Sequence, residues 1–168
     1  MKSKRKTVAL QITRDLEVVV RGPQRMAKRD ADRFVERHSD WIEANLERQR
    51  RWNTAHPEPD DAELARLKEA AQVLLPERVE HYGGVMGLTP ASVKITAAKT
   101  RFGSCSGKNG LCFSCRLMRY PQEAIDYVVV HELAHIVHKN HGKDFYGLVE
   151  SVLPDYRQRR ALLKKAVD

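Results

Sequence analysis

The sequence lacks any apolar run of about 18 residues, so no segment is long enough to cross a membrane as a helix. It has only three cysteines, an odd number that fits a reducing compartment better than a disulfide framework. The start Met1–Lys6 is basic, but the apolar stretch Thr7–Leu10 behind it is too short for the hydrophobic part of a signal peptide. These absences exclude a membrane protein and a disulfide-rich secreted one, and we expect a cytoplasmic location.

Acidic residues are also few, with 22 Asp and Glu against 30 Lys and Arg and a formal net charge of +8. Such an excess could attract nucleic acid or another polyanion. Much of it lies in short clusters such as Lys2–Lys6 and Arg48–Arg51, so we favour a solvated basic surface. A chain of 168 residues that is 42% hydrophobic and 31% charged is typical of a folded globular protein and excludes a disordered one.

The N-terminal third combines a predicted hairpin with predicted helices. Val8–Ile12 and Glu17–Arg21 are β-prone and flank a short turn, and apolar residues at helical spacing follow. Asn53–Asp60 holds two prolines and is the best linker candidate. We therefore expect residues 1–56 to form a hairpin and helical subdomain and residues 57–168 to form the catalytic part, together in one compact unit.

The second part predicts a helix followed by a β-rich stretch. Asp60 and Glu63 form a capping-box pattern that opens the helix, which we expect to stop at Gly83–Gly84. Ser92–Ala97 and Leu111–Leu117 are predicted strands, with a turn rich in Gly, Ser and Asn between them.

Four of the seven histidines fall within one short segment, HELAHIVHKNH. His131 and His135 are four positions apart, so on a helix they face the same way and can bind one Zn²⁺. Glu132 is rotated by roughly 100° from His131, where it could act as general base on metal-bound water instead of binding the metal. The preceding helix is unusually apolar, and burying these polar groups there is costly unless a metal pairs them. The motif therefore predicts a zinc site with Glu132 as catalytic residue.

A catalytic zinc usually has three protein ligands, and His141 is the favoured third ligand. It lies six residues past His135, in the HExxHxxxxxH spacing of metzincin proteases. The histidine can return to the metal only if the helix stops first, and we expect a left-handed turn at Asn140 or Gly142.

Two other residues compete for the third ligand position. His138 shares a helical face with His131 but lies about 10.5 Å along the axis, too far for one ion on a straight helix. Glu150 lies on the following helical segment, as the third ligand of thermolysin-like enzymes does, and is the main alternative to His141.

Four segments recur together in one family of proteins: RFGSCS at Arg101–Ser106, CRL at Cys115–Leu117, YVVVHELAH at Tyr127–His135 and NHGKDFY at Asn140–Tyr146. They resemble the YgjP-like metallopeptidase family, with Phe102 and Cys115 in place of tryptophans. The resemblance implies a zincin-like α+β domain in which a short antiparallel sheet packs on the HExxH helix, after an N-terminal β-hairpin and helices. It also implies His131, His135 and His141 as zinc ligands and Glu132 as catalytic.

Three hypotheses for function follow. In the first, the protein is a zinc peptidase: zinc lowers the pKa of its bound water to about 7, and Glu132 takes the proton of that water. The peptide or protein substrate would bind by adding a strand beside Ser92–Ala97 or Leu111–Leu117. In the second, the same site cleaves nucleoside triphosphates, because nucleotide pyrophosphatase activity is also ascribed to the family. The loop with Arg101, Ser104 and Lys108 would then bind phosphate. In the third, a structural zinc supports nucleic-acid binding. Structural zinc sites usually have four protein ligands, so the three ligands found in this sequence argue against that hypothesis.

Four further residues near these motifs have candidate roles. Arg116 and Tyr120 could polarise a substrate carbonyl. Cys112 and Cys115 form a CxxC pair, but positions three apart on a strand point to opposite faces, so we expect buried free thiols.

Overall fold

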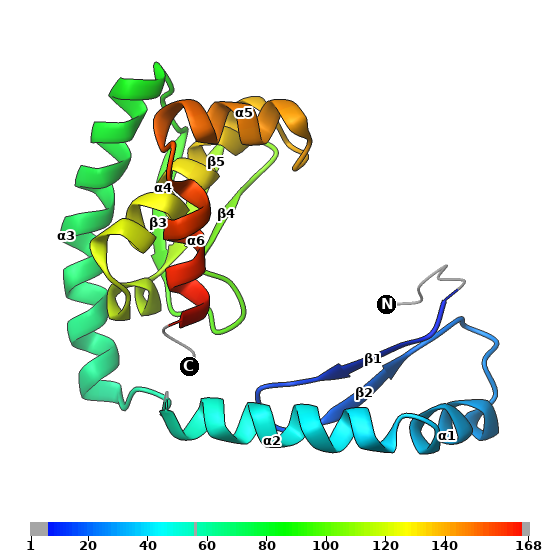
Figure 1. Ribbon diagram of the computed structural model, residues 1–168. Helices are drawn as coiled ribbons and strands as arrows, with labels where there is room; N and C mark the ends of the chain where they lie inside the picture. The colour runs from blue at the N-terminus through cyan, green and yellow to red at the C-terminus, as the bar shows by residue number, and fades with distance from the viewer. Residues whose placement is uncertain (1–6, 56, 166–168) are drawn as a thin grey trace. The chain divides into compact units, whose positions relative to one another are not determined.

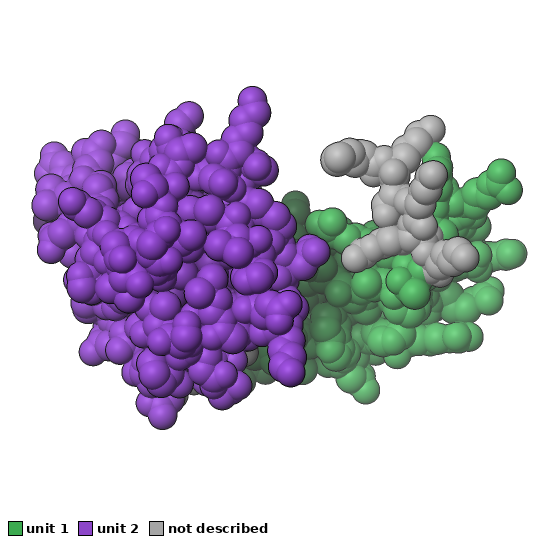
Figure 2. All heavy atoms as spheres, turned by 90° about the horizontal axis from the view of Figure 1, so that it is seen from above, with its two compact units in different colours: residues 1–58 green, residues 59–168 purple. Residues whose placement is uncertain are grey.

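The computed structural model describes residues 7–55 and 57–165, and the chain divides into two compact units, Met1–Glu58 and Pro59–Asp168 (Figure 2). The division between the units falls inside the proline-containing segment Asn53–Asp60. Within the described residues, no helix combines the length and apolar character needed to cross a membrane.

The first unit is a β-hairpin with two helices. Strands β1 and β2 pair antiparallel, which confirms the predicted hairpin, and helices α1 and α2 follow them. The elements span Ala9–Ile12, Val18–Arg21, Lys28–Glu36 and Ser39–Ala55, in that order. The hairpin is attached to α2 at Arg14, whose carbonyl accepts a 2.8 Å hydrogen bond from Asn53 and whose guanidinium lies 4.6 Å from the Trp52 ring centroid.

The second unit contains four helices, three strands and one 3₁₀ helix among its described residues (Figure 1). They are α3 (Asp61–Met86), β3 (Ser92–Thr96), β4 (Gly103–Cys105), β5 (Gly110–Ser114), η1 (Cys115–Arg119), α4 (Gln122–Val137), α5 (Lys143–Val152) and α6 (Tyr156–Lys165). The predicted cap of α3 is confirmed, because the Asp60 carboxylate accepts from the Glu63 N–H at 2.7 Å. Helix α3 continues past the expected stop at Gly83–Gly84 and ends at Gly87, whose φ is +65°.

The three strands form one sheet in the order β3-β5-β4. The α+β class is confirmed, and β4 and β5 form an antiparallel pair, although β4 lies in the segment that was expected to be a turn. Strand β3 joins the other edge of β5 in parallel, so the complete sheet is mixed. The strand predicted to reach Leu117 ends at Ser114, whose hydroxyl accepts from the Arg116 N–H at 3.3 Å and starts η1.

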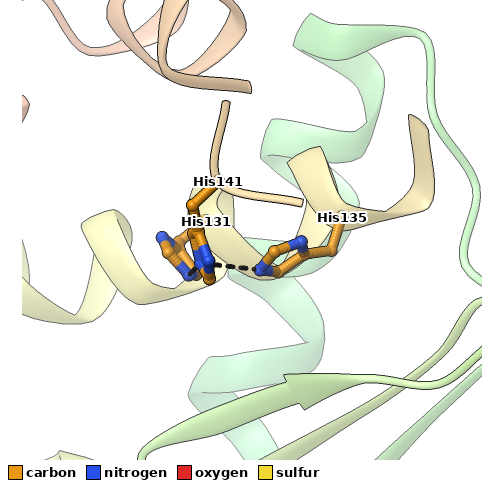
Figure 3. A group of neighbouring side chains, drawn as sticks. All are labelled: His131, His135 and His141. Carbon is orange, nitrogen blue, oxygen red and sulfur yellow. Dashed lines mark hydrogen bonds between the residues drawn. The ribbon is translucent and has the colours of Figure 1, made fainter. Parts of the chain in front are cut away.

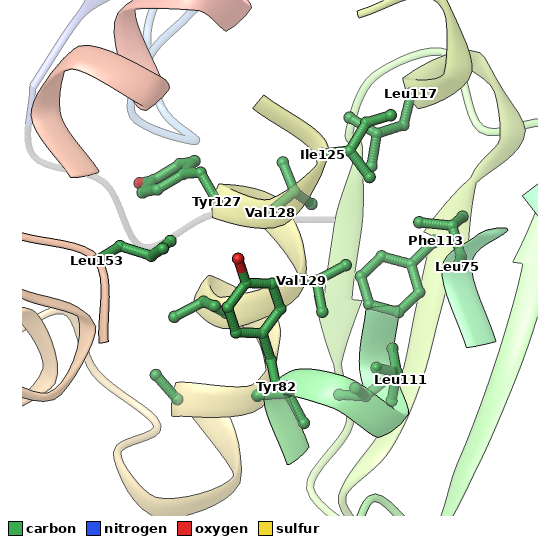
Figure 4. Close-up of a cluster of buried hydrophobic side chains, with 14 of the residues drawn as sticks. Leu75, Tyr82, Leu111, Phe113, Leu117, Ile125, Tyr127, Val128, Val129 and Leu153 are labelled. Carbon is green, nitrogen blue, oxygen red and sulfur yellow. The ribbon is translucent and has the colours of Figure 1, made fainter. Parts of the chain in front are cut away.

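Helix α4 forms the centre of the second unit. Ten of its sixteen residues are buried, because its consecutive apolar residues leave no polar face over that length. It contacts α3, α5, α6 and strand β4. In Figure 4, Val129 of α4 lies beside Phe113 of β5 and Leu75 of α3, three side chains with exposures of 0%. The helix that carries two of the predicted ligands is therefore held on several sides.

A buried carboxylate anchors α4 to its neighbours. Asp126 accepts two hydrogen bonds from the Arg78 guanidinium, at 2.8 and 2.9 Å, and one from the Tyr82 hydroxyl at 3.0 Å. Gln122 donates to it at 2.8 Å, and Arg159 lies 3.8 Å away. Burial and the negative charge of Asp126 raise the pKa of Tyr82, so its hydroxyl remains a donor. This network connects α3, α4 and α6.

Candidate metal centre

Three histidine side chains meet beside the end of α4 (Figure 3). His131 and His135 come from successive turns of α4, and His141 comes from the loop before α5. Nε2 of His141 lies 3.1 Å from Nε2 of His131 and 3.1 Å from Nε2 of His135. One nitrogen of each ring lies within 4.8 Å of the others, and the part of the chain that is described holds no second group of this kind.

The chain reverses after α4 because His138 adopts an extended conformation. Its φ of −114° and ψ of 102° end the helix, while its N–H still donates to the Ala134 carbonyl at 2.9 Å. The expected left-handed turn at Asn140 or Gly142 is wrong. Gly142 has a φ of −83°, and the described non-glycine residues with positive φ are Leu16 and Asn109.

The ring of His135 is oriented by the main chain of His138. Its Nδ1 lies 2.9 Å from the His138 carbonyl oxygen, which can only accept, so Nδ1 carries the proton. The Nε2 lone pair is then directed at the other two histidines, an arrangement typical of metal-binding imidazoles. Nδ1 of His131 lies 3.4 Å from the Tyr127 hydroxyl. His138 therefore contributes its carbonyl to this site, and its side chain lies outside the group of three.

Burial keeps the first two histidines neutral. It lowers the pKa of His131 to about 3, with the charges of His135, His141 and Arg160 acting in the same direction. Burial also lowers the pKa of His135, opposed by the bond to the His138 carbonyl. Neutral imidazole is the form that binds metal, so protons compete little with a metal ion at neutral pH.

A buried aromatic ring supports all three histidines. Phe145 of α5 has 0% exposure, and its ring centroid lies 4.9, 4.6 and 4.8 Å from those of His131, His135 and His141. An apolar ring in contact with each imidazole fixes their positions by packing and excludes water from one side.

Glu132 is buried at 6% exposure, and its Oε2 has no hydrogen-bond partner among the described residues. Burial raises the pKa of its carboxyl to about 7, although the positive charge of Arg101 acts in the opposite direction. The carboxyl fits against β4 because position 103 is glycine. A Cβ there would lie 2.6 Å from both Cγ and Oε1 of Glu132.

Phe145 and Gly103 are positioning residues that sequence reasoning did not single out. Both lie inside the recurring segments RFGSCS and NHGKDFY, which is the one signal that could have indicated them. Their contacts with the histidines and with Glu132 connect segments distant in sequence, and no local pattern encodes such contacts.

The remaining predicted residues lie outside the group of histidines. Glu150, the alternative third ligand, forms an ion pair with Arg157 at 3.2 Å. The Arg116 Nε donates to the Ala97 carbonyl at 3.3 Å, and the Tyr120 ring stacks edge-on against Phe102 at 4.8 Å.

The two CxxC thiols differ in burial, and both are free. Cys115 is buried, as expected. The same expectation is wrong for Cys112, which is only partly buried because it lies on the sheet face turned away from the core.

Two histidines and a buried glutamate on one helix, with a third histidine from the following loop, are the arrangement of a metal-dependent hydrolase. The YgjP-like, metallopeptidase domain model matches residues 6–67 and 59–166, and the chain belongs to this family. The chain also resembles the crystal structure of the metallopeptidase zymogen of Pyrococcus abyssi abylysin, with a TM-score of 0.50 and 21% identity over 55% of this chain and 93% of that one. That likeness concerns the fold. No curated protein matches the chain.

Proposed function

We propose that this chain is a zinc-dependent peptidase in which His131, His135 and His141 hold the metal and Glu132 is the general base. One observation carries the proposal: the His141 imidazole nitrogen lies 3.1 Å from those of His131 and His135, and Glu132, next to His131 in the chain, has a buried carboxylate oxygen without a partner among the described residues. Family membership supports metal-dependent peptide hydrolysis.

The donor set suits zinc. Zinc in catalytic sites takes three nitrogen or carboxylate ligands and keeps one position open, whereas magnesium and calcium prefer sites rich in oxygen. Among the described residues no fourth side chain joins the three histidines, so substrate and water have a place to bind. When bound, the ion would polarise the substrate carbonyl and make a water molecule easier to deprotonate.

Glu132 supplies the base in this proposal. Its Oε2 takes a proton from water as the water oxygen bonds to the carbonyl carbon. The carboxyl then gives that proton to the nitrogen of the breaking C–N bond, and an amine leaves. Burial raises the pKa of this carboxyl to about 7 in the metal-free protein, and a bound cation would lower it, so the carboxylate would be available to accept a proton at neutral pH.

The free edge of β4 is the best place for the peptide backbone. Phe102 accepts from the Ser114 N–H at 2.8 Å, and Ser106 donates to the Gly110 carbonyl at 2.9 Å. Because antiparallel pairing alternates, the backbone groups of Gly103, which lies against Glu132, face away from β5. A peptide that pairs with this edge would therefore lie next to the Glu132 carboxyl group.

The strand Leu111–Leu117 cannot serve in this way, contrary to expectation. Its paired part, β5, has β3 on one edge and β4 on the other. Addition of a peptide strand requires a free row of backbone donors and acceptors, which β5 does not have.

The test combines metal analysis with parallel assays. We expect the purified protein to contain about one zinc per chain and to cleave unstructured peptides, with Glu132→Gln keeping the metal and losing at least about 100-fold in rate. Nucleoside triphosphates are assayed beside the peptides. If triphosphates are hydrolysed in a reaction that depends on Glu132 while peptides stay intact, the proposed function changes from peptidase to nucleotide pyrophosphatase.

The third ligand is tested by zinc content in three alanine variants. We expect His141→Ala to lose zinc, because it removes one of the three converging nitrogens. His138→Ala and Glu150→Ala serve as matched controls and should retain it. Zinc lost from Glu150→Ala and kept by His141→Ala would assign the position to the glutamate.

A further inference from the structure

A pocket of about 400 Å³ lies on the three-stranded sheet, with residues of all three strands in its lining. Lys94 of β3 and Ser104 of β4 both pair with Cys112 of β5, so these three residues form a row across the sheet. Their side chains point away from the core, because the neighbours Val93 and Ile95 pack against it. The row ends at β4, the strand whose free edge passes Glu132.

The lining of this pocket has the chemistry of an anion site. It includes the cationic side chains of Lys94 and Arg101 and the hydroxyl groups of Ser92, Ser104 and Ser106, and it includes no Asp or Glu. Within residues 7–55 and 57–165, no carboxylate lies within ion-pair distance of either cation. Arg101 also acts electrostatically on Glu132, but neither cation has an ion-pair partner, and hydroxyl donors lie beside both, which favours a ligand that brings its own negative charge.

The register of β4 connects this pocket to the peptide. Side chains of successive residues on a strand point to opposite faces, so Gly103 faces Glu132 and Ser104 faces the pocket. In a strand added to the free edge of β4, the residue opposite Ser104 also points to the pocket face. Directly opposite residues have Cβ atoms about 5 Å apart, within reach of a carboxylate to a serine hydroxyl.

We propose that this pocket binds an acidic side chain of the substrate, so that the enzyme prefers peptides with Asp or Glu next to the cleaved bond. The inference rests on the proposed peptidase function and on the β4 edge as the peptide site. A phosphate group would suit the same cations, but Ser104 of the pocket is the neighbour of Gly103, which lies against Glu132, and this position favours a side chain of the peptide over a separate anion.

The first experiment compares cleavage of three peptides that differ at one position near the cleaved bond, which carries Glu, Gln or Lys. We expect kcat/KM for the Glu peptide to exceed that for the Gln peptide by about tenfold, as one charge-assisted hydrogen bond supplies. Lys94 lies on β3, about 14 Å from the backbone of a peptide added to β4, and acts on it through its charge and not through a hydrogen bond. Lys94→Met should therefore lower this preference, and Lys94→Glu should lower it further. Lys68→Met is the matched control, since it removes an exposed lysine of α3 that does not line the pocket.

The second experiment measures binding without cleavage. Fluorescence anisotropy follows the labelled Glu and Gln peptides on the Glu132→Gln protein, with and without Lys94→Met, and ATP is titrated as competitor. Tighter binding of the Glu peptide that is weakened in Lys94→Met supports the pocket even if no peptide is cleaved, an outcome that would reject only the peptidase proposal.

Three results would overturn the inference. Equal cleavage of the Glu and Gln peptides would reject the acidic preference and leave the peptidase intact. A preference that Lys94→Met and Lys94→Glu leave unchanged would place its origin elsewhere. Binding of ATP that depends on Lys94, with no difference between the peptides, would assign the pocket to a nucleotide phosphate.

Discussion

Gly103 and Glu132 lie so close together that a Cβ at position 103 would be 2.6 Å from the Glu132 Cγ. The backbone of β4 is held by pairing with β5, and α4 is held by the core, so neither can easily move away. The space for the proposed base therefore exists only because position 103 has no side chain.

Gly103→Ala is expected to displace the Glu132 carboxylate and lower kcat/KM by about 100-fold, the usual cost of an error of about 1 Å in a catalytic group. Zinc content should remain at the wild-type level, because the three atoms nearest a Cβ at position 103 all belong to Glu132 and none to a histidine. Gly107→Ala is the control, since a Cβ at that position would meet nothing within 4 Å. Full activity in Gly103→Ala would show that Glu132 is not the base or that the backbone of β4 shifts to make room for the added methyl group.

Phe145→Ala is expected to weaken both folding and metal binding. The substitution leaves a cavity under the three imidazoles and should lower the free energy of unfolding by about 3–5 kcal/mol. Urea unfolding with EDTA measures the first effect, and competition with a chelating dye measures the second. Phe145→Leu, which fills most of the volume, should recover most of the stability. Unchanged zinc affinity in Phe145→Ala would mean that the ring does not position the ligands.

The buried Glu132 carboxyl predicts a pH dependence of stability in metal-free protein. Its folded-state pKa is raised to about 7 from 4.5, so between these values the folded protein keeps a proton that the unfolded chain has lost. Its contribution is fully present below about pH 4.5 and is lost as the pH rises to about 7, by up to about 3 kcal/mol.

The measurement for this prediction is urea unfolding of wild type and Glu132→Gln with EDTA from pH 4.5 to 8. The lowered pKa of His131 changes stability in the opposite direction, but this histidine is present in both proteins and largely cancels in their difference. A difference between the two proteins that stays constant across this range would contradict the assignment.

Asp126→Asn is expected to lower the free energy of unfolding by about 3 kcal/mol, because it leaves the mostly buried Arg78 without its paired charge. Thermal unfolding with EDTA measures the effect. Asp32→Asn is the control: it breaks an exposed ion pair with Lys28 on α1 and should cost less than about 1 kcal/mol. Equal losses in the two variants would mean that the Asp126 network does not anchor α4.

Local features were predictable from the sequence, and features that depend on tertiary contacts were not. The Asp60 cap, the hairpin and the helix through His131 follow from spacing and residue type over a few positions. The end of α3 was misplaced because Gly83 and Gly84 tolerate a helix, while the left-handed conformation falls on Gly87.

The sheet and the loop before His141 show the same limit. The place and the parallel direction of β3 beside β5 depend on the path of the whole chain between these strands, and no local pattern states this. The spacing of the histidines predicts which residues gather, but the reversal uses an extended His138 instead of a left-handed turn.

The His138 carbonyl has a consequence for mutational tolerance. The group that orients His135 belongs to the main chain, so no side-chain substitution at position 138 deletes it. What must persist is the backbone geometry there and the N–H bond to Ala134, which proline alone cannot make. The amino acid at position 138 can therefore vary among homologues while the backbone conformation there is kept. A motif defined by side chains would overlook this position.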